Sequence, residues 1–419
     1  MRCTHALIVS SFAFIIPSLA VAAPPSFTGT GELAGGTTLS AAYGVSGDGS
    51  VVTGTSNAAT GERAFRWTRP GGMENLGDLA GGGNFSSGRG VSADGLVIVG
   101  DSGVAGGSAA FRWTAATGMM GIGDLPGGDV FAIGTAANAD GSVIVGHSGS
   151  TASGSLGADA YRWVAPGPMQ SIGDLPGAGY FSVATSVSAD GMRIAGYGSS
   201  TLSGPASSEA FRWTKGSGLQ PLGDLPGGGF GSNAFGISAD GNVVVGLAAA
   251  GAGVFAFRWT EATGMVSIGD LPGGSAFSRA NGVSGDGTRV VGQSVGGAGM
   301  HAFLWIEGEG IFDVKELLET KHGLDLTGWT LEVATAISAD GSTIVGYGPN
   351  PQGTYEGWVA HLGTDDVFGD LDGDGVVSAA DLASLLGSWG PCRGCTSDLD
   401  GDGAVGSADL ALLLGAWSA

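Results

Sequence analysis

The sequence predicts an all-β body, a seven-bladed β-propeller of four-stranded blades, followed by a small α-helical loop–helix module. The first observation is that residues 26–362 repeat one pattern seven times. Glycine, which is costly inside helices and useful in tight turns, accounts for 84 of the 419 residues. Hydrophobic residues make up 43% and charged residues only 13%, which is the balance of a chain that folds around a core.

Each repeat combines a G-D-L-P-G-G segment, an S-A-D-G turn, a V-V-G run and an A-F-R-W-T run. The turn aspartates are Asp48, Asp94, Asp140, Asp190, Asp240, Asp286 and Asp340. The matching tryptophans are Trp67, Trp113, Trp163, Trp213, Trp259, Trp305 and Trp358. The spacing of successive turn aspartates matches the sequence period of a propeller blade.

Each repeat offers four short strands. In the second repeat we expect them at residues 86–92, 96–100, 110–114 and 119–125. Asp-Gly between the first two runs favours a hairpin, because glycine accepts a positive φ.

The two ends of the repeat region predict a closed ring. Residues 26–33 align with the fourth-strand segment, and the last repeat stops after its third strand at residues 358–362. We expect the N-terminal strand to complete the seventh blade, which would hide strand edges that otherwise aggregate. An open β-solenoid or twisted sheet array is the alternative.

Repeat length varies almost only between the second and third strands. The loops at 148–160 and 199–210 are longer, and the seventh repeat has an insertion between Glu316 and Asp340. Variation on a fixed scaffold marks the face where function is expected. Trp329, inside the insertion, is the best candidate for an exposed aromatic contact, for example to a glycan.

The repeated arginines and tryptophans are expected to be structural. Five arginines each precede an aspartate of the same repeat at one constant spacing: Arg66, Arg112, Arg162, Arg212 and Arg258 before Asp78, Asp124, Asp174, Asp224 and Asp270. We expect them to pair between strands and fasten adjacent blades; a ring of ligand-binding charges is the alternative. Each tryptophan lies beside an aromatic or valine residue in an alternating strand, which favours core packing over sugar stacking.

The A-F-R-W, G-D-L-P-G-G and S-A-D-G-x-x-V-V-G units resemble the HAF-repeat family of extracellular proteins. The resemblance covers the whole repeat region, 26–362. It implies an extracellular β-repeat protein and no particular reaction. Enzyme signals are lacking among the histidines: His147, His301, His322 and His361 have no metal-ligand spacing, and H-E-x-x-H does not occur. We therefore expect no catalytic residue, although carboxylates can still converge as in glycosidases.

The N-terminus predicts a signal peptide at residues 1–22. Arg2 precedes an apolar stretch at 6–16, and Ala20-Val21-Ala22 is a small-x-small cleavage site. Cleavage would remove Cys3 and leave no membrane span in a secreted or cell-surface chain; a retained anchor is the alternative.

The acidic charge concentrates at the C-terminus. The net charge is −22, and residues 365–419 hold ten Asp and one Arg, so they contribute about −9. Such a surface argues against nucleic acid and anionic membranes, because phosphate binding needs clustered Lys and Arg. It favours divalent cations.

After a linker at 363–369, residues 370–419 contain two copies of an acidic loop, which begin at Asp370 and at Asp398. In the first, Asp370, Asp372, Asp374 and Asp381 occupy loop positions 1, 3, 5 and 12, with the Val376 carbonyl at 7 and Ser378 at 9. In the second, these positions hold Asp398, Asp400, Asp402, Asp409, the Ala404 carbonyl and Gly406. EF-hand-type loops of hard carboxylate ligands predict two calcium ions, with weaker binding at the second, which lacks a side chain at position 9.

Each loop leads into an apolar helix face. Leu382, Leu385, Leu386 and Trp389 form the first face, and Leu410, Leu413, Leu414 and Trp417 repeat it. We expect the two faces to pack together. The tail resembles dockerins, calcium-loaded modules that bind cohesins. It departs from them at loop positions 10 and 11, the partner-reading positions of dockerins, which are occupied here by Ala379-Ala380 and Ser407-Ala408. The resemblance therefore implies calcium binding more strongly than it implies a cohesin partner.

Cys392 and Cys395 lie between the two copies. A local disulfide, a redox site and a zinc half-site are the three interpretations, and the disulfide is favoured, because the tail offers no further soft ligands and no thioredoxin-like surroundings. The sequence thus favours a secreted, non-catalytic binding or surface-display propeller held through its calcium tail. A polysaccharide-acting enzyme or accessory subunit and a structural envelope protein are the alternatives. The body is expected to fold without calcium.

Overall fold

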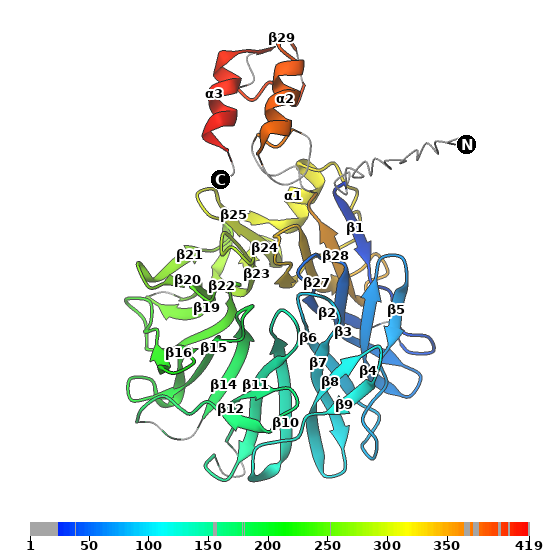
Figure 1. Cartoon of the computed structure of the whole chain (residues 1–419), viewed down its shortest axis with the longest axis vertical. Helices are drawn as coiled ribbons and strands as arrows, with labels where there is room; N and C mark the ends of the chain where they lie inside the picture. Colours follow the sequence, from blue (N-terminus) through cyan, green and yellow to red (C-terminus); the bar gives the residue numbers. More distant parts are fainter. Residues whose placement is uncertain are drawn as a thin grey trace, which may run out of the picture. The chain divides into compact units, whose positions relative to one another are not determined.

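The computed structural model describes residues 24–417 except 38, 154–156, 178, 180, 252, 364–368, 372–376, 393–394 and 401–402. The signal peptide expected at 1–22 and most of the linker expected at 363–369 lie outside the described residues. The contacts divide the chain between Leu362 and Gly363, with Pro25–Leu362 as one compact unit. This body is built almost entirely of β-strands, and its architecture is propeller-like (Figure 1).

The strands of the body follow one another as antiparallel meanders, with β1 (Ser26–Gly29) standing before the first. The first meander consists of β2 (Ser40–Val45), β3 (Val51–Ala58), β4 (Gly61–Thr68) and β5 (Gly72–Asn75). The second consists of β6 (Ser86–Val91), β7 (Ile98–Val104), β8 (Gly107–Thr114) and β9 (Gly118–Gly121). The third consists of β10 (Gly127–Ala137), β11 (Val143–Ser150), β12 (Asp159–Val164) and β13 (Met169–Ser171). The fourth meander consists of β14 (Ser182–Val187), β15 (Arg193–Ser200), β16 (Gly204–Thr214) and β17 (Gly218–Pro221). The fifth consists of β18 (Ser232–Ile237), β19 (Val243–Ala250), β20 (Gly253–Thr260) and β21 (Gly264–Gly269). The sixth meander consists of β22 (Gly273–Val283), β23 (Arg289–Gly296), β24 (Gly299–Ile306) and β25 (Gly310–Asp313). Helix α1 (Val314–Thr320) follows it, and the last meander consists of β26 (Val333–Ile337), β27 (Thr343–Pro349) and β28 (Tyr355–His361).

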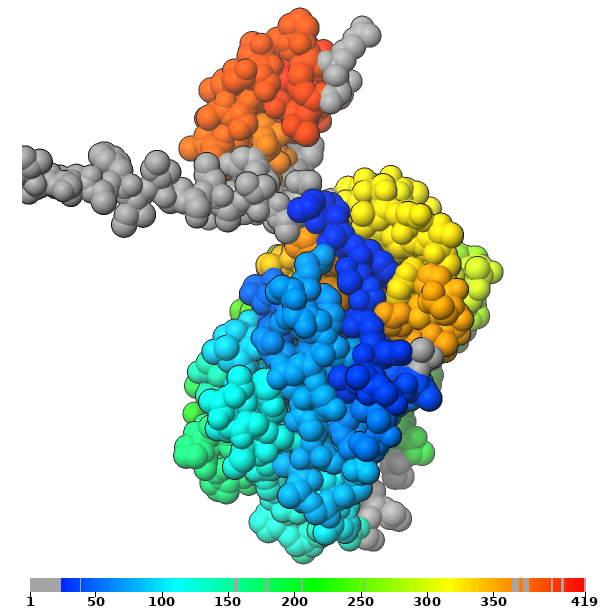
Figure 2. Space-filling model, turned by 90° about the vertical axis from the view of Figure 1, so that its right-hand side faces the viewer, coloured from blue at the N-terminus to red at the C-terminus, as the bar shows by residue number. Residues whose placement is uncertain are grey.

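The N-terminal strand completes the last meander, as the two ends of the repeat region predicted. β1 pairs antiparallel with β28, in a register that runs from Ser26 opposite His361 to Gly29 opposite Trp358. Figure 2 shows these N-terminal residues lying against residues of the last repeat. Phe27 on β1 packs edge-on against Trp329, with ring centroids 5.0 Å apart. The two ends of the body therefore hold each other.

The Asp-Gly turns connect the meanders to one another through backbone hydrogen bonds. Each turn donates an N–H to a carbonyl of the next turn along the chain, and the last returns to the first. The bonds run from Gly47 to Ala93 (2.9 Å), Asp94 to Ala139 (3.1 Å), Ala139 to Ala189 (3.2 Å), Ala189 to Ala239 (2.9 Å), Ala239 to Gly285 (2.9 Å), Gly285 to Ala339 (2.8 Å) and Asp340 to Gly47 (3.2 Å). The meanders are thus linked in a closed circuit at this end.

Each turn is also fixed internally by its serine. In the fifth repeat, the buried Ser238 donates its hydroxyl to Asp240 Oδ1 at 2.6 Å and accepts the N–H of Val243 at 2.9 Å. Gly241 follows with φ +73°, a backbone conformation that favours glycine. In the third repeat Asn138 replaces the serine and accepts the N–H of Val143 at 2.8 Å. These contacts explain why the turn motif repeats.

The core lies between neighbouring meanders. Phe111 and Trp113 of β8 pack with Ile98 of β7 against Ala64 and Leu76 from the preceding repeat. Most A-F-R-W tryptophans are buried, which agrees with the expected packing role. Since every such layer draws on two repeats, no meander buries its apolar face alone.

Two expectations about the repeat are wrong in detail. Among the described residues, none of the five arginines pairs with the aspartate that follows it at the constant spacing. Instead Arg162 and Arg258 donate Nε to turn carbonyls of the next repeat, at Gly191 (3.0 Å) and Gly287 (3.1 Å). Both fasten adjacent repeats through the backbone. Arg258 also pairs with Glu307 of the next repeat at 3.2 Å, as Arg212 does with Glu261 at 3.3 Å. The fourth strand is also shorter than expected: β9 ends at Gly121, because Gly123 turns the chain with φ +85°.

Candidate functional site

The tail is built around helices α2 (Ala379–Gly387) and α3 (Ser407–Gly415) and a short pair, β29 (Gly390–Pro391) with β30 (Ala404–Val405). Its core consists of Leu385 and Leu413 from the helices with Val377 and Val405 from the loops. The predicted helix faces pack only in part. Leu386, Trp389, Leu414 and Trp417 are exposed, because such short helices bury only the inner turn of each face.

The first acidic loop is described only at its ends. Asp372, Asp374 and Val376 lie outside the described residues. Asp381 is fully buried, and its carboxylate accepts the N–H of Leu371 and the N–H of Ser378, both at 2.7 Å. Ser378 in turn caps α2 by accepting the N–H of Ala380 at 3.2 Å. The loop's last carboxylate is therefore held by backbone at loop positions 2 and 9.

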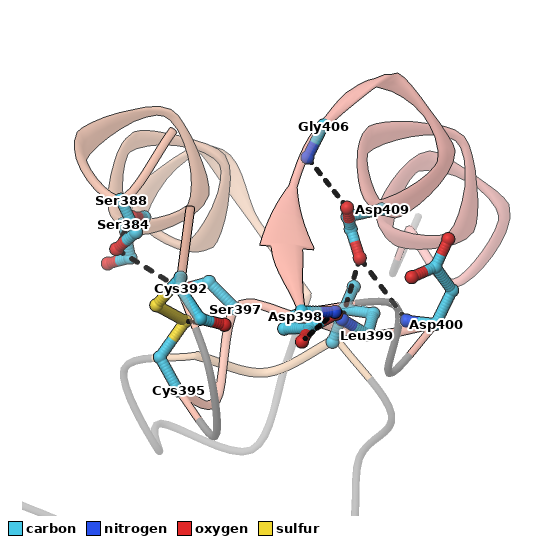
Figure 3. Close-up of a disulfide and its surroundings, with 11 residues drawn as sticks. Ser384, Ser388, Cys392, Cys395, Ser397, Asp398, Leu399, Asp400, Gly406 and Asp409 are labelled. Carbon is cyan, nitrogen blue, oxygen red and sulfur yellow. Dashed lines mark hydrogen bonds between the residues drawn. A yellow bond between two sulfur atoms is a disulfide. The ribbon is translucent and has the colours of Figure 1, made fainter. Parts of the chain in front are cut away.

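The second loop repeats this arrangement at the equivalent positions (Figure 3). The carboxylate of Asp409 accepts N–H groups from Leu399 and Gly406, both at 2.7 Å, and from Asp400 at 3.2 Å. The hydrogen bond from Gly406 N–H, with those from Asp400 and Leu399, lowers the pKa of Asp409 despite its burial. This carboxylate is therefore ionised at neutral pH.

Three carboxylates converge in the second loop. One oxygen each of Asp398, Asp400 and Asp409 lie within 4.8 Å of one another. Asp398 Oδ2 accepts the N–H of Gly403 at 2.9 Å, whereas its Oδ1 is buried and has no hydrogen-bond partner among the described residues. Asp402 lies outside the described residues, and Ala404, whose carbonyl stands at loop position 7, lies in β30.

The electrostatics of this triad fit a hard divalent cation. Asp409 is buried, Asp398 is half-buried and Asp400 is exposed. A buried carboxylate needs a compensating charge, and three negative groups this close repel one another. Arg393 is the only basic residue in 365–419, so side chains of the tail offer little neutralisation. The orphaned Asp398 oxygen is the donor type that Ca²⁺ takes. The donor set therefore fits the predicted ion at Asp398, Asp400 and Asp409.

A disulfide lies beside the second loop. Cys392 and Cys395 are joined, with Cα atoms 5.8 Å apart. Figure 3 shows the disulfide beside the loop. Cys392 also donates its N–H to the carbonyl of Gly403 at 3.0 Å, and this hydrogen bond ties the segment after α2 to the loop. The serine Ser397 reaches Ser388, at the end of α2, with hydroxyl oxygens 3.4 Å apart.

Trp329, the aromatic residue expected to be exposed, is half-buried against Phe27. Its carbonyl accepts Lys315 Nζ at 2.9 Å, which connects the insertion to α1. The ring thus contributes to closure of the body, and contact with a ligand stays a prediction.

A cavity at the centre of the body was not predicted from the sequence. It has a volume of about 310 Å³, and we call it the central cavity. One residue five positions before each turn aspartate lines it: Tyr43, Arg89, Thr135, Thr185, Phe235, Asn281 and Thr335. The available signal was that this position differs in most repeats while its neighbours are nearly constant.

Within the described ranges, no helix combines the length and apolar character needed to cross a bilayer. No family model matches the chain, and no curated protein matches it. Solved structures do resemble it. An oligogalacturonate lyase from Vibrio parahaemolyticus has a TM-score of 0.52 at 10% identity, covering 81% of this chain and 97% of the lyase.

Two further structures are less similar. The β-propeller domain of the Trilobed protease from Pyrococcus furiosus has a TM-score of 0.43 at 13% identity, over 65% of this chain and 79% of that domain. TolB from Acinetobacter baumannii has a TM-score of 0.37 at 14% identity, over 52% of this chain, which spans about half (51%) of TolB. Such similarities show the fold alone, and they include enzymes as well as proteins of other kinds.

Proposed function

We propose that the chain is a secreted, non-catalytic binding or display protein, a seven-bladed propeller held in place through a calcium-binding tail. The convergence of Asp398, Asp400 and Asp409 around an unpartnered, buried carboxylate oxygen carries the proposal. Two calcium ions are expected because both loops hold their last aspartate in the same way.

The closed propeller is supported by the circuit of hydrogen-bonded turns and by the pairing of β1 with β28. A body closed in this way is a rigid platform that presents loops and a central cavity. No reaction is assigned to it. The alternative, a polysaccharide-acting enzyme, would release reducing ends when the chain is incubated with a polysaccharide. Our proposal predicts no more reducing ends than the heat-inactivated protein releases.

The tail offers a surface for a protein partner. Leu386 and Trp389 near the end of α2, and Leu414 and Trp417 near the end of α3, are exposed apolar side chains. Exposed apolar groups of this size mark interaction sites. We propose that calcium fixes the two loops and so orders this surface for a cohesin-like or cell-surface protein.

Calorimetric titration of the chelator-treated full chain with Ca²⁺ tests the proposal. Two sites are expected, the second weaker. Asp381→Asn should remove one site and Asp409→Asn the other, because each keeps the shape of the side chain and removes the charge. Asp129→Asn, at an exposed position of β10 in the body, is the matched control and should leave both sites intact. Absence of binding heat in the folded, unsubstituted chain would refute the calcium module.

A further inference from the structure

The central cavity has two distinct ends. At one end it is bounded by the hydrogen-bonded turns, since Gly47, Ala93 and their equivalents also line it. The residues seven positions before each turn aspartate, with their cross-strand partners, do not line the cavity themselves. In the sixth repeat these are Arg279 and Gln293, and in the seventh they are Val333 and Tyr347. Contacts of Arg279 and Tyr197 with Phe235, and of Tyr347 with Tyr43, connect them to its lining at the other end. We call this the far end of the cavity.

The far end is where the repeats differ most. The residues seven positions before the turn aspartates are Ala41, Ser87, Ile133, Val183, Asn233, Arg279 and Val333. Their partners are Thr55, Asp101, His147, Tyr197, Leu247, Gln293 and Tyr347. The position between, six before the aspartate, is always Ala or Gly. The repeats thus keep a small residue at one position and differ at the next, so each repeat can present a different side chain at the far end of the cavity.

Arg279, at the far end of the cavity, carries a charge for which the described residues provide no partner. Its guanidinium lies over Phe235, with Cζ 3.9 Å from the ring centroid. Its Nε is buried without an acceptor, and the guanidinium makes no hydrogen bond or ion pair with any described residue. By contrast Arg89, which lines the central cavity, is paired with Asp101 at 2.5 Å. Arg279 therefore supplies one uncompensated positive charge.

Tyrosine hydroxyls flank this charge. Tyr197 packs on Phe235 with centroids 6.0 Å apart, and Tyr43 packs on Tyr347 at 6.3 Å. Burial raises the pKa of all three tyrosines, and the charge of Arg279 only partly offsets this for Tyr197 and Tyr347. The hydroxyls thus stay protonated, and in the described part of the chain none of the three bonds to a protein acceptor. Tyr197 and Tyr347, which feel the charge of Arg279, thus offer unused donors beside an unpaired cation.

We propose that the far end of the central cavity binds the carboxylate group of an organic ligand, with Arg279 as its ion-pair partner. A single uncompensated charge matches a monoanion, and a planar guanidinium matches a carboxylate in a bidentate geometry. The tyrosine hydroxyls are placed to donate to oxygen atoms of the ligand, and Phe235 holds the guanidinium from the side. This inference rests on the proposed role of the body as a binding module and specifies the ligand class.

Saturation-transfer NMR on the full chain tests it with two sources of carboxylate. One arm uses D-glucuronate, with D-glucose as the neutral match. The other uses N-acetyl-trialanine with a free C-terminus, with the C-terminal amide as its match. We expect saturable binding of one of the two acids and at least tenfold weaker binding of its neutral match. The arm that binds identifies the source of the carboxylate.

Variants locate the site. Arg279→Met should weaken binding of that acid at least tenfold, while Arg69→Met, on an exposed surface residue, should not. Tyr347→Phe keeps the ring and should weaken binding severalfold, which guards against a folding defect in the arginine variant. Binding of neither acid by the folded chain, or equal binding after Arg279→Met, overturns the inference. Equal binding of the neutral sugar also overturns it, but leaves the binding role of the body standing. Calcium titration of the tail is independent of all these outcomes.

Discussion

Ser238 provides a sharp test of how the turns hold the body together. Its side chain is fully buried, donates to Asp240 Oδ1 at 2.6 Å and accepts the N–H of Val243 at 2.9 Å. Ser238→Ala leaves a buried N–H without an acceptor, which costs about 1–3 kcal/mol. Asp240 loses little, because its exposed carboxylate still accepts the N–H of Asn242. We therefore expect the free energy of unfolding to fall by about 2 kcal/mol.

The assay is urea unfolding of the full chain followed by tryptophan fluorescence. Two matched variants sharpen it. Ser238→Asn should cost less than the alanine change, because Asn138 accepts the equivalent N–H in the third repeat. Asn242→Ala removes an exposed hydrogen bond to Asp240 and should change stability by no more than about 0.5 kcal/mol. Equal stability of Ser238→Ala and the unsubstituted chain would refute the reasoning.

Three further predictions concern closure, charge and pH. Phe27→Ala should cost about 2 kcal/mol, since the ring is only half-buried, and a double-mutant cycle with Trp329→Ala should show a coupling of about 0.5–1.5 kcal/mol; additivity would contradict the packing of β1 against the insertion. Arg258→Leu, copying Leu304 of the next repeat, removes the bond to Gly287 and the ion pair with Glu307, and should lower stability by about 1 kcal/mol in the same urea assay. An unchanged midpoint would show that both contacts are dispensable. The hydrogen bonds from the Ser188 hydroxyl and the Met192 N–H lower the pKa of Asp190, so its ionised carboxylate stabilises the fold above its ordinary pKa of about 3.9. This stabilisation is lost as the pH falls through the lower pKa of the folded state. Asp190→Asn should therefore flatten the fall of the urea midpoint below about pH 4, and an unaltered pH profile would contradict this.

The sequence was most informative where one residue type answers one local demand. The Asp-Gly turns, the buried tryptophans and the pairing of residues near Ser26 with those near Trp358 were all predicted, because spacing and periodicity determine them. The partner of each arginine was predicted wrongly. An arginine side chain reaches several acceptors, and spacing alone does not distinguish a carboxylate later in the same repeat from a turn carbonyl of the next repeat.

The candidate sites divide in the same way. The spacing of the acidic loops predicted that Asp398, Asp400 and Asp409 would converge, because loop positions 1, 3 and 12 face one centre. The exposure of Leu386 and Trp417 was missed, since a helical pattern shows a face but not how much of it a short helix buries. Arg279 and Phe235 come from different repeats, so only the three-dimensional structure brings them together.

Amide hydrogen exchange of the full chain with and without Ca²⁺ tests most directly the claim that calcium belongs to the tail while the body folds without it. We predict slower exchange with calcium in the loops around Asp381 and Asp409 and in α2 and α3, and unchanged exchange throughout residues 25–362. Equal exchange of the tail in calcium and in chelator would contradict the claim, and so would strands of the body that lose protection when calcium is removed.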